Sequence, residues 1–138
     1  MTDSQEFEPD TNPHPNGDLA IQTLALAANT NQYGDIFGGW LAAQMDLAAS
    51  VACGKVARGK VATVAIDSIA FLSPVQVGSI VSCYTRVRGV GRSSIKVNVE
   101  AWVMPEAGND EWTKVAEGRF IFVAIDGNGR TRAIPRPA

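Results

Sequence analysis

The fold of this chain is decided by Trp40-Leu-Ala-Ala-Gln-Met-Asp-Leu-Ala-Ala-Ser-Val-Ala-Cys53, which directly follows Gly34-Asp-Ile-Phe-Gly-Gly39. The stretch is rich in Ala, Leu and Met and contains no Pro, and its length favours a helix over a strand. A helix that is apolar on nearly all of its faces is a buried helix. We therefore expect a buried helix from about Trp40 to Val56, ended by Gly54 and the Arg58-Gly59-Lys60 turn.

Asp46 is the one charged residue within residues 40–53. An ionised carboxylate in an apolar helix costs several kcal/mol unless it is paired, hydrogen-bonded or protonated. Its position therefore favours a chemical role for Asp46. The alternative is a structural carboxylate that binds a buried hydroxyl or backbone group.

After the helix the pattern becomes that of β-strands. Alternating and β-branched residues predict strands over 61–72, 79–88, 94–103 and 113–125, and a first strand over 19–26 before the helix. Residues 1–18 are polar and proline-rich and predict a mobile tail before a single domain over 19–138. One helix cannot cover both faces of such a sheet. We expect an α+β domain whose antiparallel sheet curls round the helix, with another subunit covering the rest.

Composition excludes several classes of function. The net charge of −2 argues against a nucleic-acid partner, and no apolar run reaches membrane-spanning length. The first ten residues have neither a basic start nor an apolar core, so we expect no signal peptide and a cytoplasmic protein. Cys53 and Cys83 fall in the predicted helix and in a predicted strand, which favours free buried thiols over a disulfide.

Histidine usage narrows the chemistry further. The only histidine, His14, lies between two prolines in the predicted tail. Ser–His–Asp and Cys–His mechanisms need an imidazole inside the fold. Two scattered cysteines do not make a zinc site, so we expect no metal. Mechanisms that use carboxylates, amides and backbone dipoles remain.

Six linked blocks of sequence carry a resemblance to a known family. They are 29–41 (Asn-Thr-Asn-Gln-Tyr-Gly-Asp-Ile-Phe-Gly-Gly-Trp-Leu), 44–46 (Gln-Met-Asp), 62–67 (Ala-Thr-Val-Ala-Ile-Asp), 71–78 (Phe-Leu-Ser-Pro-Val-Gln-Val-Gly), 91–95 (Gly-Arg-Ser-Ser-Ile) and 123–126 (Val-Ala-Ile-Asp). Through them the chain resembles the hotdog-fold acyl-CoA thioesterases, in particular the small bacterial broad-specificity enzymes. The resemblance implies a hydrolase of acyl-CoA thioesters with no cofactor beyond the coenzyme A of its substrate. It also implies a homo-oligomer, often a hexamer built as a trimer of dimers, with coenzyme A at subunit interfaces.

The resemblance places the catalytic carboxylate at Asp46, as general base on water or as nucleophile. Thioester hydrolysis also needs donors for the carbonyl oxygen as it becomes negative. The first N–H groups of a helix lack partners, and the helix dipole favours negative charge there. Gly38 and Gly39 have no side chains, so a carbonyl can approach their N–H groups closely. The alternative is that these glycines only allow tight packing of the loop against the helix.

Spacing along the helix adds a hypothesis about assembly. Gly38 and Asp46 are roughly 12 Å apart along the axis at 1.5 Å per residue, too far to act on one carbonyl. A twofold dimer with antiparallel helices places Gly38 of one chain near Asp46 of the other. We therefore expect a site shared between two subunits.

Four further residues are secondary candidates near the thioester. Asp35 and Asn31 precede the glycine pair. In relatives an amide or acid at this place positions the carbonyl or the water. The alternative for both residues is helix capping or an Asx-turn. Thr63 and Asp67 alternate along the strand beside the helix and are expected on one face, where one of them lines the thioester end of the channel. The alternative for both is a solvent-facing position.

Coenzyme A carries phosphates, so basic residues should gather near its nucleotide end. Arg92, with Ser93 and Ser94 at a predicted hairpin tip, is the first candidate for this role. Arg58 and Lys60 at the helix exit come next, and further candidates are Arg119, Arg130 and Arg132.

Two rival functions use the same fold. A hotdog hydratase or dehydratase typically uses a histidine, which the position of His14 disfavours. A non-catalytic acyl-CoA-binding or sensing protein is disfavoured by Asp46.

Overall fold

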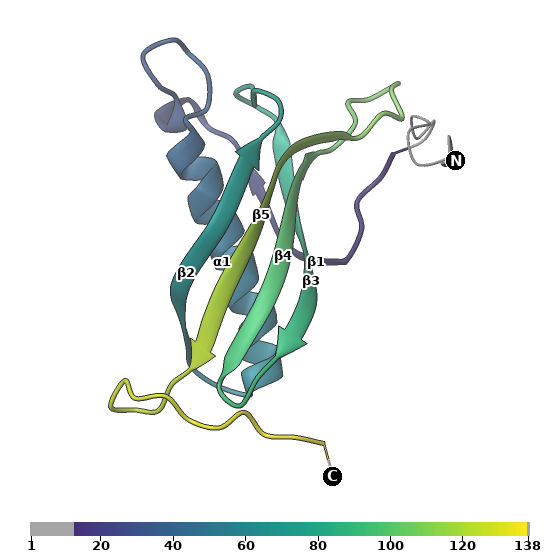
Figure 1. Cartoon of the computed structure of the whole chain (residues 1–138). Helices are drawn as coiled ribbons and strands as arrows, with labels where there is room; N and C mark the ends of the chain where they lie inside the picture. Colours follow the sequence, from purple (N-terminus) through teal and green to yellow (C-terminus); the bar gives the residue numbers. More distant parts are fainter. Residues whose placement is uncertain (1–12, 138) are drawn as a thin grey trace, which may run out of the picture.

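The computed structural model describes residues 13–137 (Figure 1). Their regular elements are β1 (Asp18–Leu24), the 3-10 turn η2 (Ala27–Asn29), α1 (Gly38–Ala57), β2 (Val61–Phe71), β3 (Ile80–Val90), β4 (Ser94–Val103) and β5 (Thr113–Ala124). The strands form one antiparallel sheet in the order β1-β3-β4-β5-β2, and α1 lies along one face of it. The expected α+β architecture, a sheet wrapped on one long helix, is confirmed.

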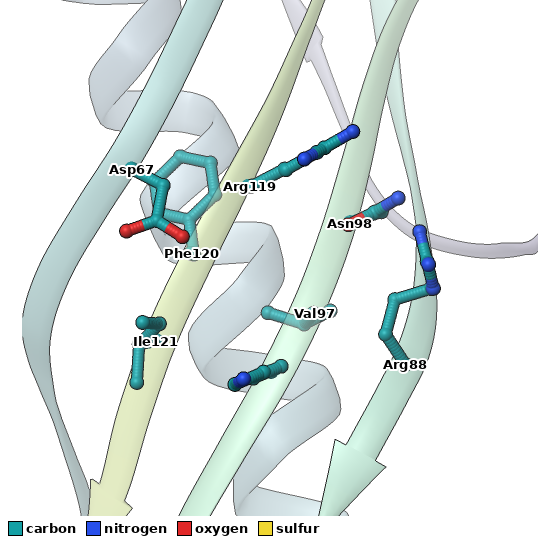
Figure 2. Close-up of a pocket in the computed structure, with 8 residues that line it drawn as sticks. Asp67, Arg88, Val97, Asn98, Arg119, Phe120 and Ile121 are labelled. Atoms are coloured by element: carbon teal, nitrogen blue, oxygen red, sulfur yellow. The ribbon is translucent and has the colours of Figure 1, made fainter.

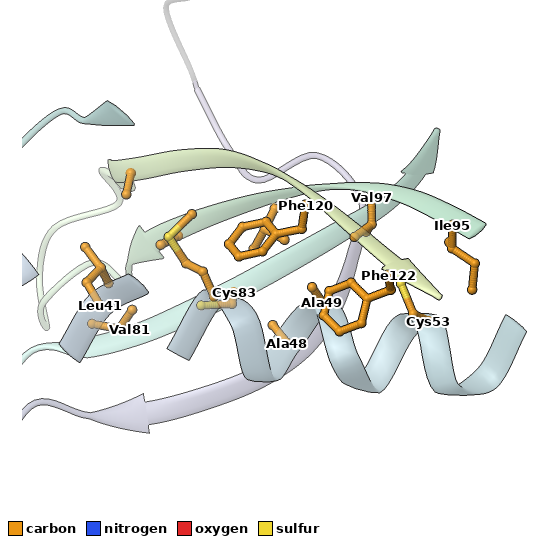
Figure 3. Close-up of a cluster of buried hydrophobic side chains, with 14 of the residues drawn as sticks. Leu41, Ala48, Ala49, Cys53, Val81, Cys83, Ile95, Val97, Phe120 and Phe122 are labelled. Atoms are coloured by element: carbon orange, nitrogen blue, oxygen red, sulfur yellow. The ribbon is translucent and has the colours of Figure 1, made fainter. Parts of the chain in front are cut away.

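The core lies between the sheet and α1. Figure 3 shows the rings of Phe120 and Phe122 pointing from β5 toward α1, where the small side chains of Ala48 and Ala49 leave room for them. All four residues are at most 1% exposed. Alternation in β4 turns its apolar residues to this face, as the sequence predicted. The helix ends where expected, with Arg58 in the left-handed conformation and the N–H of Gly59 donating to the carbonyl of Gly54.

One face of α1 is not covered by its own chain. Leu47 is 55% exposed and Val51 40% exposed, one helical turn apart on the side away from the sheet. The expectation of a helix buried on nearly all faces is therefore wrong for the single subunit. None of the helices in residues 13–137 is long and apolar enough to cross a membrane.

The connection from β2 to β3 does not join neighbouring strands. β2 pairs with β5 at one edge of the sheet, and β3 lies beyond β4. Residues 72–79 therefore cross the start of α1, and the N–H of Ile36 donates to the carbonyl of the buried Val75 at 3.1 Å. This crossover brings the end of β2 against the loop that precedes the helix.

The folded part of the chain begins slightly before the predicted boundary at residue 19. Residues 1–12 of the predicted tail lie outside the described residues. Asp18 already pairs with Thr85, and the N–H of Asn16 donates to Oε1 of Glu100 at 3.2 Å. Gly17 has φ +113°, and a Cβ there would lie 2.6 Å from the carbonyl oxygen of Thr85, so this close approach requires glycine.

The two cysteine thiols give a prediction that checks the core. Cys53 and Cys83 are buried and unpaired, and burial raises the pKa of each thiol to about 12. A neutral buried thiol is a poor nucleophile. A disulfide-exchange reagent at pH 8 should therefore titrate no thiol in the native protein and two per chain after denaturation. Rapid labelling of the native protein would contradict this packing.

Candidate active site

Asp46 and Thr63 meet between the helix and the edge strand. Asp46 lies in the middle of α1 and is partly buried, and Thr63 lies near the start of β2. The Thr63 hydroxyl donates to Oδ1 of Asp46 at 2.8 Å. Within residues 13–137, no protein group donates to Oδ2. The carboxylate is thus held by one oxygen and has the other available for a water or a substrate.

The start of α1 presents two unused donors. In the described part of the chain, the N–H groups of Gly38 and Gly39 donate to no protein acceptor, and both residues are exposed. A Cβ on Gly39 would lie 3.1 Å from the Phe37 ring, and one on Gly38 would lie 3.3 Å from the Phe71 ring. A pocket of about 350 Å³, lined by Phe71, Gly38, Leu41 and the 72–75 crossover, opens beside them. The glycines keep this helix end clear of side chains.

These two parts of the site are far apart in one chain. Gly38 and Asp46 belong to one continuous 20-residue helix, so their separation of roughly 12 Å along its axis stands. A single subunit therefore holds its carboxylate and its helix-start donors too far apart for one carbonyl.

Asn31 forms an Asx-turn in the loop before the helix. Its Oδ1 accepts from the N–H groups of Tyr33 at 2.9 Å and Asp35 at 3.2 Å. In the described residues its Nδ2 makes no hydrogen bond. Asp35 does not cap α1, because the N-cap position is Phe37 and no side chain bonds to the cap. The loop is fixed by backbone bonds as well, with the N–H of Asn31 donating to the Asp35 carbonyl at 2.7 Å.

Thr63 and Asp67 do not share a face, which corrects the expectation from strand alternation. Thr63 reaches α1, whereas Asp67 lines a pocket together with Lys96 and Arg119 on the face of the sheet away from the helix (Figure 2). The reason is the break in the β2–β5 register between Thr63 and Ala65, which is followed by a second break between Ile66 and Ser68 at Asp67 itself. Such bulges shift the alternation of side chains. Asp67 is therefore removed from the candidate thioester site.

The predicted phosphate-binding residues, apart from Arg119, gather at one end of the molecule, the end of α1 opposite Gly38 (Figure 1). This basic end consists of Lys55, Arg58, Lys60, Arg92, Arg130, Arg132 and Arg136, seven of the chain's 12 Lys and Arg residues. Asp126 lies among them, and Asp18 lines a pocket together with Lys55. The loops at the opposite end carry Asp35, Glu106, Asp110 and Glu111 and no Lys or Arg. The chain thus has a pronounced charge polarity that its net charge of −2 conceals.

The C-terminal segment holds the Arg92 hairpin in place. The N–H of Ile134, itself buried, donates to the Arg92 carbonyl at 2.8 Å, and Nη2 of Arg136 donates to the Gly91 carbonyl at 2.6 Å. The Ser93 carbonyl accepts from the N–H of Ala124 at 2.8 Å. Sequence reasoning missed Arg136, because an arginine between two prolines near the C-terminus carries no local signal. Among residues 13–137, the His, Cys, Asp and Glu side chains form no group of three suited to a metal ion.

Comparison with known proteins places the chain in a family. Residues 33–106 match the family model described as the thioesterase superfamily. An uncharacterized acyl-CoA thioester hydrolase of Haemophilus influenzae is 47% identical over 87% of this chain and 79% of its own length.

Solved structures share the fold. The hexameric thioesterase y2039 from Yersinia pestis is 42% identical, with a TM-score of 0.85 over 89% of this chain and 100% of that one. An acyl-CoA hydrolase from Staphylococcus aureus, solved with butyryl coenzyme A and coenzyme A, is 30% identical, with a TM-score of 0.77 over 83% of this chain and 70% of that one. Alanine variants of an asparagine, an aspartate and a threonine of that enzyme have structures, and these residues have the spacing of Asn31, Asp46 and Thr63.

The expected resemblance and the hotdog fold are both confirmed by these matches. The chain belongs to the thioesterase superfamily.

Proposed function

We propose that the chain hydrolyses acyl-CoA thioesters to a free carboxylic acid and coenzyme A. The observation that carries the proposal is the Asp46 carboxylate, which accepts a hydrogen bond from Thr63 at 2.8 Å and lies in an otherwise almost wholly apolar stretch of helix. The names of two relatives, acyl-CoA thioester hydrolases at 47% and 43% identity, support the substrate class. A non-catalytic acyl-CoA-binding protein would have no need for this acid.

Asp46 acts on the thioester in one of two ways. Its free Oδ2 either takes a proton from the attacking water or attacks the carbonyl carbon itself. In both cases negative charge develops on the carbonyl oxygen and the coenzyme A thiolate leaves. In the second case a mixed anhydride with Asp46 remains, and water hydrolyses it to release the acid and restore the carboxylate. The unpartnered N–H groups of Gly38 and Gly39 stabilise that charge, and the helix dipole adds to their effect. The free Nδ2 of Asn31 is a further donor close to this helix start.

The site is completed by a second copy of the chain. In the described chain β2 has a sheet neighbour on one side only, and Val64 and Ile66 on it are 55% and 47% exposed. An unpaired apolar edge is a surface for strand pairing. A twofold axis beside β2 sets two α1 helices antiparallel, so that Asp46 of one chain faces Gly38 of the other. Hexameric structural relatives support assembly of three such dimers.

The basic end binds the phosphates of coenzyme A. Arg92 at the braced hairpin, with Ser93 and Ser94, is the first contact, and Arg58 and Lys60 at the helix exit add positive charge. Guanidinium groups suit phosphates because they donate in a planar fork. The reaction uses no cofactor other than the coenzyme A of the substrate.

Substitution of Asp46 tests the function directly. Asp46→Asn keeps the shape of the side chain and removes its basicity, so kcat should fall by at least about 100-fold. Free-thiol release from a series of acyl-CoAs of short, long and aromatic chain measures this, with a melting curve as the control for folding. Binding of acyl-CoA without turnover by the wild type would instead identify a sensing protein.

Thr63 offers a matched pair of variants. Thr63→Val deletes the hydroxyl that holds Asp46, and kcat should fall about 10- to 100-fold, the worth of a hydrogen bond to a charged group. Thr63→Ser keeps the hydroxyl and should retain most activity. KM should change little in either variant, since Thr63 acts through Asp46. Full activity in Thr63→Val together with a loss in Thr63→Ser would mean that the methyl group, and not the hydrogen bond, matters.

Complementation between subunits tests the shared site. Gly38→Val and Asp46→Ala should each be inactive alone. After unfolding and refolding together, mixed dimers should contain one intact site of two and restore about a quarter of wild-type activity. A mixture of Gly38→Val with the Gly38→Val/Asp46→Ala double variant is the control and should restore none. Background activity in the first mixture would contradict a site shared between chains.

A further inference from the structure

The face of the sheet away from α1 carries a group of cationic side chains that the proposed reaction does not use. We define the outer-face cluster as Arg86, Arg88, Lys96, Asn98 and Arg119, from β3, β4 and β5. Asn98 is paired with Arg119 on one side and with Arg86 on the other, so the three side chains form one row across the sheet. Arg88, Lys96, Asn98 and Arg119 line a pocket of about 180 Å³ (Figure 2).

The charges of this cluster are not balanced within the chain. The neighbouring row contains Glu100 and Glu117, but both are engaged by Lys114, at 3.4 and 2.6 Å. Within residues 13–137, none of the four cations of the cluster forms an ion pair with a carboxylate. Asp67 is the one acid that lines the same pocket. Like charges close together on one face of a sheet repel one another, and an anion bound among them would relieve that repulsion.

The pocket is separate from the candidate thioester site. Asp46 and Thr63 lie between β2 and α1, on the opposite face of the sheet. The basic end lies at the helix exit and at the β3–β4 hairpin, beyond the cluster along the strands. The pocket offers donors from two guanidinium groups, an ammonium and a carboxamide. So many donors suit a ligand with several anionic oxygens better than a ligand with one carboxylate.

We propose that the outer-face cluster is a second anion-binding site, which takes a phosphate-bearing ligand. The guanidinium groups of Arg88 and Arg119 approach from either side of Asn98 (Figure 2), and Lys96 adds a third positive charge to the pocket. The site does not depend on thioester hydrolysis and stands whether or not the chain turns over acyl-CoA.

Pyrophosphate titration by calorimetry at low salt tests this proposal. The Arg58→Gln/Arg92→Gln variant first weakens binding at the basic end, because it removes the first-contact arginine and the helix-exit arginine. In that background one pyrophosphate should still bind per chain, and the further changes Lys96→Gln/Arg119→Gln should weaken binding by at least about tenfold. Lys55→Gln/Arg130→Gln in the same background removes the same charge from the remaining residues of the basic end. It should change the affinity by less than about threefold, because the remaining pyrophosphate lies at the outer-face cluster.

Three results would overturn the proposal. They are absence of binding in the Arg58→Gln/Arg92→Gln background, equal losses in the outer-face and control variants, and unchanged affinity in the outer-face variant. Sedimentation of the variants, which reports their oligomeric state, tests whether the cluster is instead a contact between subunits. If Lys96→Gln/Arg119→Gln dissociates the oligomer while pyrophosphate affinity stays the same, the cluster contacts carboxylates of another subunit and is not a ligand site. Melting curves of every variant check that the fold is retained.

Discussion

The hydrogen bond from Thr63 to Asp46 is the constraint on which the rest of the site depends. It joins the one long helix to the edge strand of the sheet and fixes one oxygen of the carboxylate at 2.8 Å. Because β2 follows α1 after only a three-residue turn, the two elements run side by side and the contact forms between neighbours in the sequence. The carboxylate is thereby held without a second charge, which leaves its other oxygen for chemistry.

The sheet order decides where this pair lies in the molecule. The crossover after β2 sends β3 to the far side of β4 and leaves β2 at an edge. The acid therefore sits next to an open, apolar edge and not in a closed pocket of its own chain. In the proposed dimer, a second copy that pairs along this edge would bring the missing donors. The acidic loops lie near the start of α1 and the basic end lies near its end. In the proposed function, the carbonyl donors and the phosphate-binding residues therefore belong to opposite ends of the helix.

The elements and the acid were predictable from the sequence, because both depend on local patterns. The apolar stretch over 40–53 predicts the helix, a lone carboxylate within it identifies Asp46, and clean alternation predicts β4. The face of the sheet on which Asp67 lies was not predictable, because the register breaks in β2 cannot be recognised from the alternation of apolar and polar residues in its sequence. The strand order and the bracing of the Arg92 hairpin by Arg136 depend on contacts between distant residues, which a single sequence does not encode locally.

The central claim is that each thioester is bound by residues of two chains. The most direct test is a crystal structure of the Asp46→Asn variant with a thioether analogue of an acyl-CoA, which keeps a carbonyl but has no scissile thioester. We predict that the carbonyl oxygen accepts a hydrogen bond from Gly38 or Gly39 of one subunit, while the substituted amide at position 46 and the Thr63 hydroxyl come from the other subunit. A carbonyl bound by Gly38 and residue 46 of the same chain, or bound away from both, would contradict the account.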